Sequence, residues 1–169
     1  MILYPNRYIE KVTDIDVKFL EENSIKGLIL DVDNTLIDFD KKMIDGLEQW
    51  AEELKQNNIK LCILSNSNKK DKVKKISEAL EVPYFYFAKK PFKFGFKKAK
   101  TLLNLENKNI AVVGDQIFTD VLGANRCKMY SILVKPIAEK DIWITVFKRP
   151  LENKIIEKYK KSINIINKI

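Results

Sequence analysis

Two aspartates follow an apolar run near the start of the chain, in the stretch LILDVDNTLIDFD, residues 28–40. Asp31 and Asp33 stand two positions apart, and side chains at that spacing in an extended segment point to the same side. Two carboxylates held together repel each other and raise one another's pKa, so a positive group should compensate them. Oxygen ligands with several waters suit Mg²⁺. We therefore expect the two aspartates to share a magnesium ion.

Further polar residues follow the later apolar runs, at the points where strands should end. They are Ser65 and Asn66, Lys90, Asp115 and Asp120. Ser65 can donate to a phosphoryl oxygen, Lys90 can offset its charge, and Asp115 can join the metal site. Asp31 could serve as the nucleophile that forms an aspartyl-phosphate, and Asp33 could act as general acid and base. Together these residue types predict metal-assisted phosphoryl transfer.

The composition narrows the chemistry. The chain has 169 residues and no histidine, which excludes Ser-His-Asp and Cys-His catalysis and histidine metal ligands. Cys62 and Cys127 have no CxxC partner, so we interpret both as small buried hydrophobes in a reducing compartment. Acid–base chemistry must then fall to carboxylates, lysines or tyrosines.

The apolar runs and the helical spacing between them predict the elements that position these residues. Strands are expected at residues 27–32, 59–65, 83–88, 109–114 and 129–134. Helices are expected at residues 14–23, 43–58, 69–80, 94–105, 118–127 and 151–169. The alternation predicts an α/β fold, a doubly wound, Rossmann-like, parallel five-stranded sheet in which ligands bind beyond the carboxyl ends of the strands. We interpret the aromatic run 84–87 as part of a core strand rather than as a base-stacking platform.

The whole chain, residues 1–169, is expected to form one domain with a basic C-terminal helical tail from about residue 150. The net charge is +8, but most lysines are interpreted as surface solvation, and three arginines give little support for nucleic-acid recognition. Residues 148–169 include seven basic and two acidic residues. Segment 141–150 is interpreted as a helix on the domain edge, with an element near anionic lipid as the alternative.

The start of the chain lacks the pattern of a signal or transit peptide, and no apolar run is long enough to cross a bilayer. These two features predict a cytoplasmic protein, with peripheral attachment to a membrane as a further alternative. The expected partner is a phosphorylated substrate, which includes an anionic phospholipid at a membrane surface. The oligomeric state is not indicated by any pattern in the sequence.

Four motifs occur in order along the chain: DVDNTL, SNS, KP and GDQIFTD. In this order they resemble the haloacid dehalogenase (HAD) superfamily of phosphatases, and more narrowly the YqeG-type branch of subfamily IIIA. That branch is related to the phosphatidylglycerophosphate phosphatases of mitochondria and plastids. The resemblance runs from roughly residue 5 to residue 150. It implies a Mg²⁺-dependent phosphomonoester hydrolase that acts through an aspartyl-phosphate, on phosphatidylglycerophosphate or another bulky phosphate.

The resemblance also implies roles for the acidic motifs. Asp31 would be the nucleophile and a metal ligand, and Asp33 the acid and base that also gives the metal its backbone carbonyl. Thr35 would help to fix the loop after the first strand. Asp115 would be a metal ligand, and Asp120 would act nearby through water. Alternatively, Asp120 would simply favour the N-terminal end of its helix electrostatically.

The remaining motifs would handle the phosphoryl group. The resemblance implies that Ser65 and Asn66 hold it and that Lys90 neutralises the charge between it and the nucleophile. Lys89 is the adjacent alternative, although Pro91 favours Lys90 as the motif lysine. Relatives that act on small metabolites usually carry a cap domain between these motifs. Neither interval here has room for one, which predicts an open site that accepts a bulky substrate or a lid from a partner chain.

Two other functions compete with the enzyme. One is a non-catalytic phosphate- or RNA-binding assembly module that uses the basic face. It does not explain why Asp33, an acid/base residue that a pure binder does not need, is present. The other is a receiver domain, but receivers place an acidic pair on the first strand and the phosphorylated aspartate on a later one, which this chain does not match.

Overall fold

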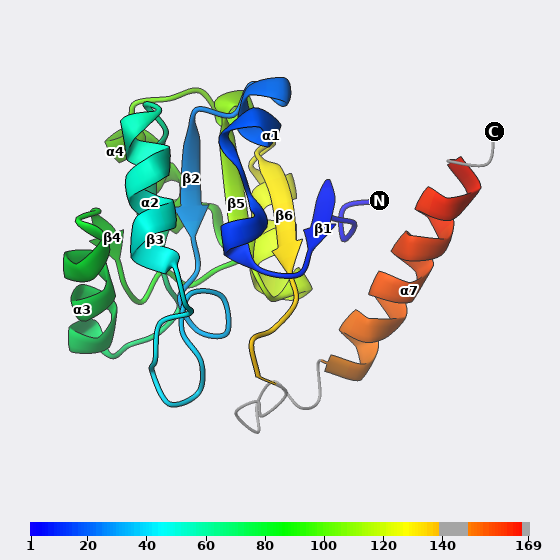
Figure 1. Cartoon of the computed structure of the whole chain (residues 1–169). Helices are drawn as coiled ribbons and strands as arrows, with labels where there is room; N and C mark the ends of the chain where they lie inside the picture. The colour runs from blue at the N-terminus through cyan, green and yellow to red at the C-terminus, as the bar shows by residue number, and fades with distance from the viewer. Residues whose placement is uncertain (139–148, 167–169) are drawn as a thin grey trace.

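The computed structural model describes residues 1–138 and 149–166, which form an α/β fold around a six-stranded parallel sheet (Figure 1). The strands are β1 (Arg7–Ile9), β2 (Gly27–Leu30), β3 (Lys60–Leu64), β4 (Tyr84–Phe85), β5 (Ile110–Gly114) and β6 (Tyr130–Val134). Their order in the sheet is β1-β6-β5-β2-β3-β4, and all neighbouring pairs are parallel. The doubly wound α/β fold predicted from the sequence is therefore confirmed.

The prediction of five strands is wrong by one. The additional strand, β1, pairs with the end of β6 through the register Arg7↔Ile132 to Ile9↔Val134. It contains only three residues, the first of which is an exposed arginine. Such a short edge strand has no apolar run that would reveal it in the sequence.

The helices lie close to their predicted positions. They are α1 (Val17–Glu22), α2 (Leu47–Gln56), α3 (Lys70–Leu80), α4 (Lys93–Leu103), α5 (Leu122–Arg126) and α7 (Arg149–Ile166). Helix α2 begins later than residue 43 because Met43 is bridged to Ile37 in the loop after β2. A π-helical turn, η3 (Ile117–Val121), leads into α5. Most of the segment 141–150 lies outside the described residues.

The central strand β2 faces two cores. Leu28 and Leu30 pack into a cluster with Leu54 of α2, while Ile29 packs into a second cluster with Phe96 of α4. Because both faces are covered, the strand is apolar at every position, as expected for a parallel sheet. Cys62 and Cys127, interpreted as buried hydrophobes, both lie in the second core.

The C-terminal helix α7 packs beside η3 and the β1 edge of the sheet (Figure 1). Its Ile155 lies in a small cluster with Ile117 and Leu133. The Tyr159 ring meets Tyr4 edge to face, with the ring centroids 5.7 Å apart. None of the helices in the described ranges is long and apolar enough to cross a bilayer.

Candidate active site

Three buried carboxylates meet at the carboxyl end of the central strands. Asp31 follows β2, Asp115 follows the adjacent β5, and Asp120 lies in η3. One oxygen from each lies within 4.8 Å of the other two. The backbone N–H of Asp31 donates to Val113 at 2.9 Å, so the chain is still in register with β5 where the side chain leaves it. The adjacent parallel strands therefore bring these acids together, as the sequence predicts for Asp31 and Asp115.

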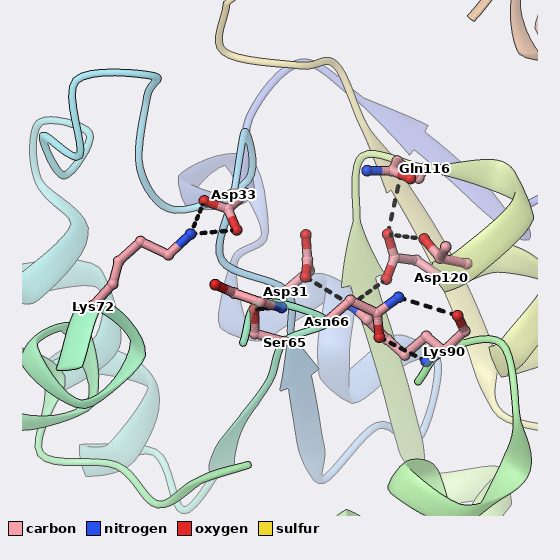
Figure 2. Close-up of polar contacts among 10 residues, drawn as sticks. Asp31, Asp33, Ser65, Asn66, Lys72, Lys90, Gln116 and Asp120 are labelled. Carbon is pink, nitrogen blue, oxygen red and sulfur yellow. Dashed lines mark hydrogen bonds and ion pairs between the residues drawn. The ribbon is translucent and has the colours of Figure 1, made fainter. Parts of the chain in front are cut away.

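Lys90 links two of these carboxylates (Figure 2). Its Nζ lies 2.6 Å from Asp31 Oδ1 and 2.6 Å from Asp120 Oδ1, and its side chain is only 3% exposed. Lys89 instead is exposed, with its Nζ 5.1 Å from the centroid of the Phe87 ring. Of the two adjacent lysines, the structure therefore brings Lys90 into the cluster.

Asn66 and Ser65 hold the loop that carries this lysine. The Asn66 side chain accepts from the Lys90 backbone N–H at 2.6 Å and donates to the Lys90 carbonyl at 3.0 Å (Figure 2). The Ser65 carbonyl accepts from Ala88 at 2.9 Å, while its buried hydroxyl accepts from the Ser67 N–H at 3.1 Å. The Asn66 side chain thus fixes Lys90 in place, and its contact with phosphate remains a prediction.

Asp33 lies apart from the three-carboxylate cluster, contrary to the expectation that its side chain points with Asp31 to one cation. Both of its oxygens accept from Lys72 Nζ of α3, at 2.5 and 2.7 Å (Figure 2). The chain turns immediately after β2, because Thr35, Leu36 and Ile37 all donate to the Val32 carbonyl. Strand alternation therefore stops before Asp33. Its backbone carbonyl as a metal ligand is not tested by this arrangement.

Thr35 is buried in that turn, and its hydroxyl has no hydrogen-bond partner among the described residues. Its backbone N–H donates to the Val32 carbonyl at 3.2 Å and helps to close the turn. The backbone of Thr35 therefore helps to hold this loop, and a role for its hydroxyl stays a prediction.

The charges in the cluster are not balanced. Burial raises the pKa of Asp31 to about 7, and the charge of Asp120 adds to this effect while Lys90 opposes it. Burial also raises the pKa of Asp115 well above its usual range, with Asp31 adding and Arg149 opposing. Burial alone would lower the pKa of Lys90, but Asp120 and Asp31 outweigh it and raise that pKa. The site therefore favours additional positive charge.

Asp115 reveals two functional residues that sequence reasoning did not place at the site. Its Oδ2 accepts from Arg149 Nη2 at 2.5 Å, and its carbonyl accepts from Arg149 Nη1 at 3.1 Å. Glu152 accepts from the backbone N–H groups of Ile117 and Phe118, and so connects α7 to the start of η3. Arg149 is one of only three arginines in the chain, which is the single sequence signal that could have marked it.

The second oxygen of Asp115 fits a metal ligand. Asp115 Oδ1 is buried and has no hydrogen-bond partner in the described part of the protein. An unsatisfied buried carboxylate oxygen costs free energy unless another group binds it. With Asp31 and Asp120 so close, the donor set is all oxygen and carries excess negative charge. These residues fit a hard divalent cation such as Mg²⁺.

Asp120 occupies a place that requires a glycine beside it. A Cβ added to Gly114 would lie 2.2 Å from Asp120 Cγ. Asp120 Oδ2 also accepts from the Gln116 N–H at 3.2 Å, while its Oδ1 binds Lys90 (Figure 2). Asp120 therefore satisfies the start of η3, as the electrostatic alternative expects, and belongs to the acidic cluster as well.

Known proteins are similar in sequence to this chain over most of its length. The family model described as Mitochondrial PGP phosphatase matches residues 1–139. The chain belongs to the mitochondrial PGP phosphatase family. This membership makes it a phosphatase and confirms the resemblance to YqeG-type phosphatases and to the phosphatidylglycerophosphate phosphatases that the four motifs indicated.

Two curated relatives agree with the family. "Probable phosphatase YqeG" of Bacillus subtilis (strain 168) is 38% identical over 162 residues, which cover 95% of this chain and 94% of the relative. "Phosphatidylglycerophosphatase GEP4, mitochondrial" of Saccharomyces cerevisiae is 32% identical over 146 residues, which cover 78% and 77%. Both alignments extend across the greater part of each protein.

Solved structures agree on the fold of this PGP phosphatase family member. The cobalt-bound deoxy-D-mannose-octulosonate 8-phosphate phosphatase YrbI of Haemophilus influenzae has a TM-score of 0.51 at 18% identity, covering 83% of this chain and 92% of that one. A protein of Listeria monocytogenes serotype 4b has a TM-score of 0.56 at 17% identity, covering 70% and 85%. At these identities the likeness shows a shared fold.

Proposed function

We propose that this chain is a Mg²⁺-dependent phosphomonoester hydrolase that acts through an aspartyl-phosphate on Asp31. The observation that carries the proposal is the convergence of Asp31, Asp115 and Asp120, with Asp115 Oδ1 buried and unpaired among the described residues. A purely structural cluster would satisfy that oxygen with a hydrogen bond. A site made for a cation would leave it available.

The metal would be held by the carboxylates of Asp31 and Asp115 and by the backbone carbonyl of Asp33, as the motif resemblance implies. Asp120 adds a third carboxylate close to them and keeps Lys90 in position. When bound, a divalent cation supplies positive charge that offsets the repulsion between these carboxylates and a phosphate group.

The first chemical step belongs to Asp31. One carboxylate oxygen attacks phosphorus, a new bond forms between that oxygen and phosphorus, and the bond to the ester oxygen breaks. Lys90, which already donates to Asp31 Oδ1, orients the carboxylate and places positive charge beside the transferring group. Asp33 gives its proton to the departing oxygen, so the alcohol leaves neutral.

The second step returns the enzyme to its starting state. Asp33, now ionised, takes a proton from a water molecule, and the water oxygen attacks phosphorus. The bond between phosphorus and Asp31 breaks, inorganic phosphate leaves, and the carboxylate of Asp31 is restored. Asp33 can take part only if its ion pair with Lys72 opens, because Lys72 contacts both of its oxygens.

The proposed substrate is phosphatidylglycerophosphate or another phosphomonoester with a bulky alcohol part. In the described chain, only α2 and its preceding loop lie between β2 and β3, and only α3 lies between β3 and β4. No inserted domain therefore limits the substrate there. The family's description names PGP, and the related yeast protein is named as a phosphatidylglycerophosphatase.

The test is phosphate release by the purified protein from an aryl phosphate and from phosphatidylglycerophosphate in detergent micelles, with Mg²⁺ or with EDTA. We expect turnover with Mg²⁺, little with EDTA, and loss of at least about 10⁴-fold in Asp31→Asn. Asp33→Asn should retain more activity, since an acid/base contributes roughly 10²–10⁴-fold.

Two outcomes would contradict the proposal. Full turnover by a correctly folded Asp31→Asn variant would exclude Asp31 as the nucleophile. Equal rates with Mg²⁺ and with EDTA would exclude the metal. Circular dichroism of each variant separates these outcomes from a failure to fold.

A further inference from the structure

The surface beside the site exposes a dense group of aromatic side chains. In the described part of the chain, half of the ten exposed large hydrophobic residues lie between residues 86 and 102. Four are aromatic and 41% to 66% exposed: Tyr86, Phe87, Phe92 and Phe94. The interpretation of residues 84–87 as a core strand is confirmed for Tyr84 and Phe85, which form β4 and pack against the two cores, and is wrong for Tyr86 and Phe87, which are exposed beyond the end of β4. Single exposed hydrophobic residues are ordinary, but a group of this size marks an interaction surface.

Lysines are interleaved with these rings. Each ammonium lies over or near an aromatic face: Lys98 is 4.4 Å from the Phe94 centroid and 6.0 Å from Phe85, Lys89 is 5.1 Å from Phe87, and Lys70 is 6.0 Å from Tyr86. The sequence has six lysines and no acidic residue between Glu81 and Glu106. We name the four exposed aromatics with Lys70, Lys89 and Lys98 the aromatic–lysine surface.

Two shallow hollows connect Tyr86, Phe87 and Phe94 of this surface through Lys98. One, of about 590 Å³, is lined by Phe85, Phe94, Lys97, Lys98, Thr101 and Leu102. Another, of about 520 Å³, is lined by Tyr84, Phe85, Tyr86, Phe87 and Lys98. Phe85 and Lys98 belong to both. The hollows combine apolar floors with cationic edges and contain no carboxylate.

This surface adjoins the candidate active site through the backbone. Phe87 donates to the Ser67 carbonyl at 2.9 Å, next to the Ser65 loop. The backbone N–H of Phe92 donates to the Lys89 carbonyl at 3.0 Å. In the sequence, Lys90 therefore lies between two exposed phenylalanines, Phe87 and Phe92. A fifth exposed aromatic, Phe39, comes from the loop that follows β2. Exposed aromatic rings therefore occur both in the loop that follows Asp31 and in the segment that contains Lys90.

We propose that the aromatic–lysine surface docks this protein on an anionic lipid bilayer, with the active site facing the membrane. Aromatic rings insert at the level of the headgroups, and lysines beside them are attracted to anionic lipids. The charge complementarity is one-sided, because the segment has no acidic residue to repel such lipids. A single-stranded nucleic acid is less favoured, since the chain has only three arginines, of which Arg126 lies next to the aromatic–lysine surface and donates to the Pro91 carbonyl. The orientation rests on the proposed function, whereas the docking itself does not.

The experiment is co-sedimentation with vesicles of phosphatidylcholine alone and of phosphatidylcholine with phosphatidylglycerol. We expect the wild-type protein to bind the anionic vesicles and to lose that binding in high salt. Two variants should each bind the anionic vesicles at least about tenfold more weakly than the wild type: Phe87→Ser/Phe92→Ser/Phe94→Ser and Lys89→Glu/Lys98→Glu. Both should hydrolyse a soluble aryl phosphate like the wild type.

Matched controls change the same properties elsewhere. Ile2→Ser/Leu151→Ser removes two exposed hydrophobic side chains away from the surface. Lys18→Glu/Lys108→Glu gives the same change in net charge at lysine side chains that are 82% and 77% exposed. Both control variants should bind anionic vesicles within about twofold of the wild type, since a docking surface is local.

The docking proposal is overturned if the wild type does not bind anionic vesicles, or if the control variants weaken binding as much as the surface variants do. It is also overturned if the surface variants retain wild-type binding, or if they lose salt-dependent RNA binding while vesicle binding is unchanged. The Asp31→Asn variant separates this proposal from the enzymatic one, because it should bind vesicles normally. Vesicle binding without any phosphatase activity would contradict only the proposed function.

Discussion

Two lysine–aspartate ion pairs lie at the same edge of the sheet, in very different surroundings. Lys90 and Asp31 have side chains that are 3% and 10% exposed, and Asp120 on the other side of Lys90 is 2% exposed. Lys72 is 14% exposed, and its partner Asp33 is 46% exposed. Both pairs have an oxygen within 2.6 Å of the ammonium, so distance alone does not distinguish them.

The difference in exposure matches the different tasks that we propose for the two aspartates. A nucleophile must stay in one place, and the buried pair fixes Asp31 with the backbone register of β2 and β5. An acid and base must change partners during each cycle, and a half-exposed ion pair costs little to open. Water around Asp33 weakens its attraction to Lys72, whereas no such screening reaches Lys90.

The largest expected effect is the difference in stability between two variants in which the lysine of each ion pair is replaced by methionine. In the presence of EDTA, Lys90→Met should lower the free energy of unfolding by about 3–5 kcal/mol, because two buried carboxylates lose their cation. Lys72→Met should lower it by less than about 1 kcal/mol, since its partner is half-exposed. Urea denaturation of both variants measures the difference. Equal losses would show that burial does not distinguish the pairs.

The pH dependence of stability probes the buried side of the comparison. Burial raises the pKa of Asp31 from 3.8 to about 7. Between these values the folded protein keeps a proton that the unfolded chain releases, so the stability of the metal-free protein should fall as the pH rises. The expected slope is on the order of 1 kcal/mol per pH unit. Thermal unfolding with EDTA, across this range, measures it.

The Asp31→Asn variant is the control for this titration. It removes the titrating carboxyl, so its stability should vary less with pH than that of the wild type. Mg²⁺ should restore stability mainly at the upper end of the range, where the carboxylates are ionised. A wild-type stability that has the same pH dependence as that of the variant, or that rises from acid to neutral pH, would contradict the charge imbalance at Asp31.

A smaller effect is expected from alanine substitutions at two glycines, Gly114 in the buried cluster and Gly46 at the protein surface. Gly114→Ala should lower activity by about tenfold or more, because its Cβ would displace the Asp120 carboxylate. Gly46→Ala should instead cost about 1 kcal/mol of stability, since Gly46 has a φ of +78° but nothing within 4 Å of an added Cβ. In the Gly46→Ala variant, the activity per folded molecule should be unchanged. Comparison of turnover with the unfolding midpoint of each variant tests both.

The sequence predicted what depends on regular alternation and failed where the chain leaves it. Apolar strands placed Asp31 and Asp115 at neighbouring strand ends, and they lie together. The same alternation, extended past β2, placed the Asp33 carboxylate beside Asp31. The turn around the Val32 carbonyl breaks that alternation and directs Asp33 to Lys72. Turn geometry of this kind is not encoded by hydrophobic periodicity.

Long-range partners were also beyond the sequence. Lys72 is one of several lysines in the run KKDKVKK, and composition alone does not indicate which of them meets Asp33. Arg149 and Glu152 follow the predicted sheet by many residues, yet they hold Asp115 and the start of η3. Only the packing of α7 against the sheet brings them there. The sequence did not reveal the role of Gly114 either, because its missing Cβ leaves space for the Asp120 side chain, and that contact is visible only in the structure.

The most direct test of the account asks which atom receives the phosphoryl group. The Asp33→Asn variant with Mg²⁺ would be mixed with an excess of phosphomonoester, quenched in acid during turnover, digested and analysed by peptide mass spectrometry. We predict a phosphoryl group on the peptide that contains Asp31, and none in Asp33→Asn that also carries Asp31→Asn. A phosphoryl group on another side chain, such as Ser65, or sustained turnover with no phosphorylated peptide at any time, would contradict the central role of Asp31.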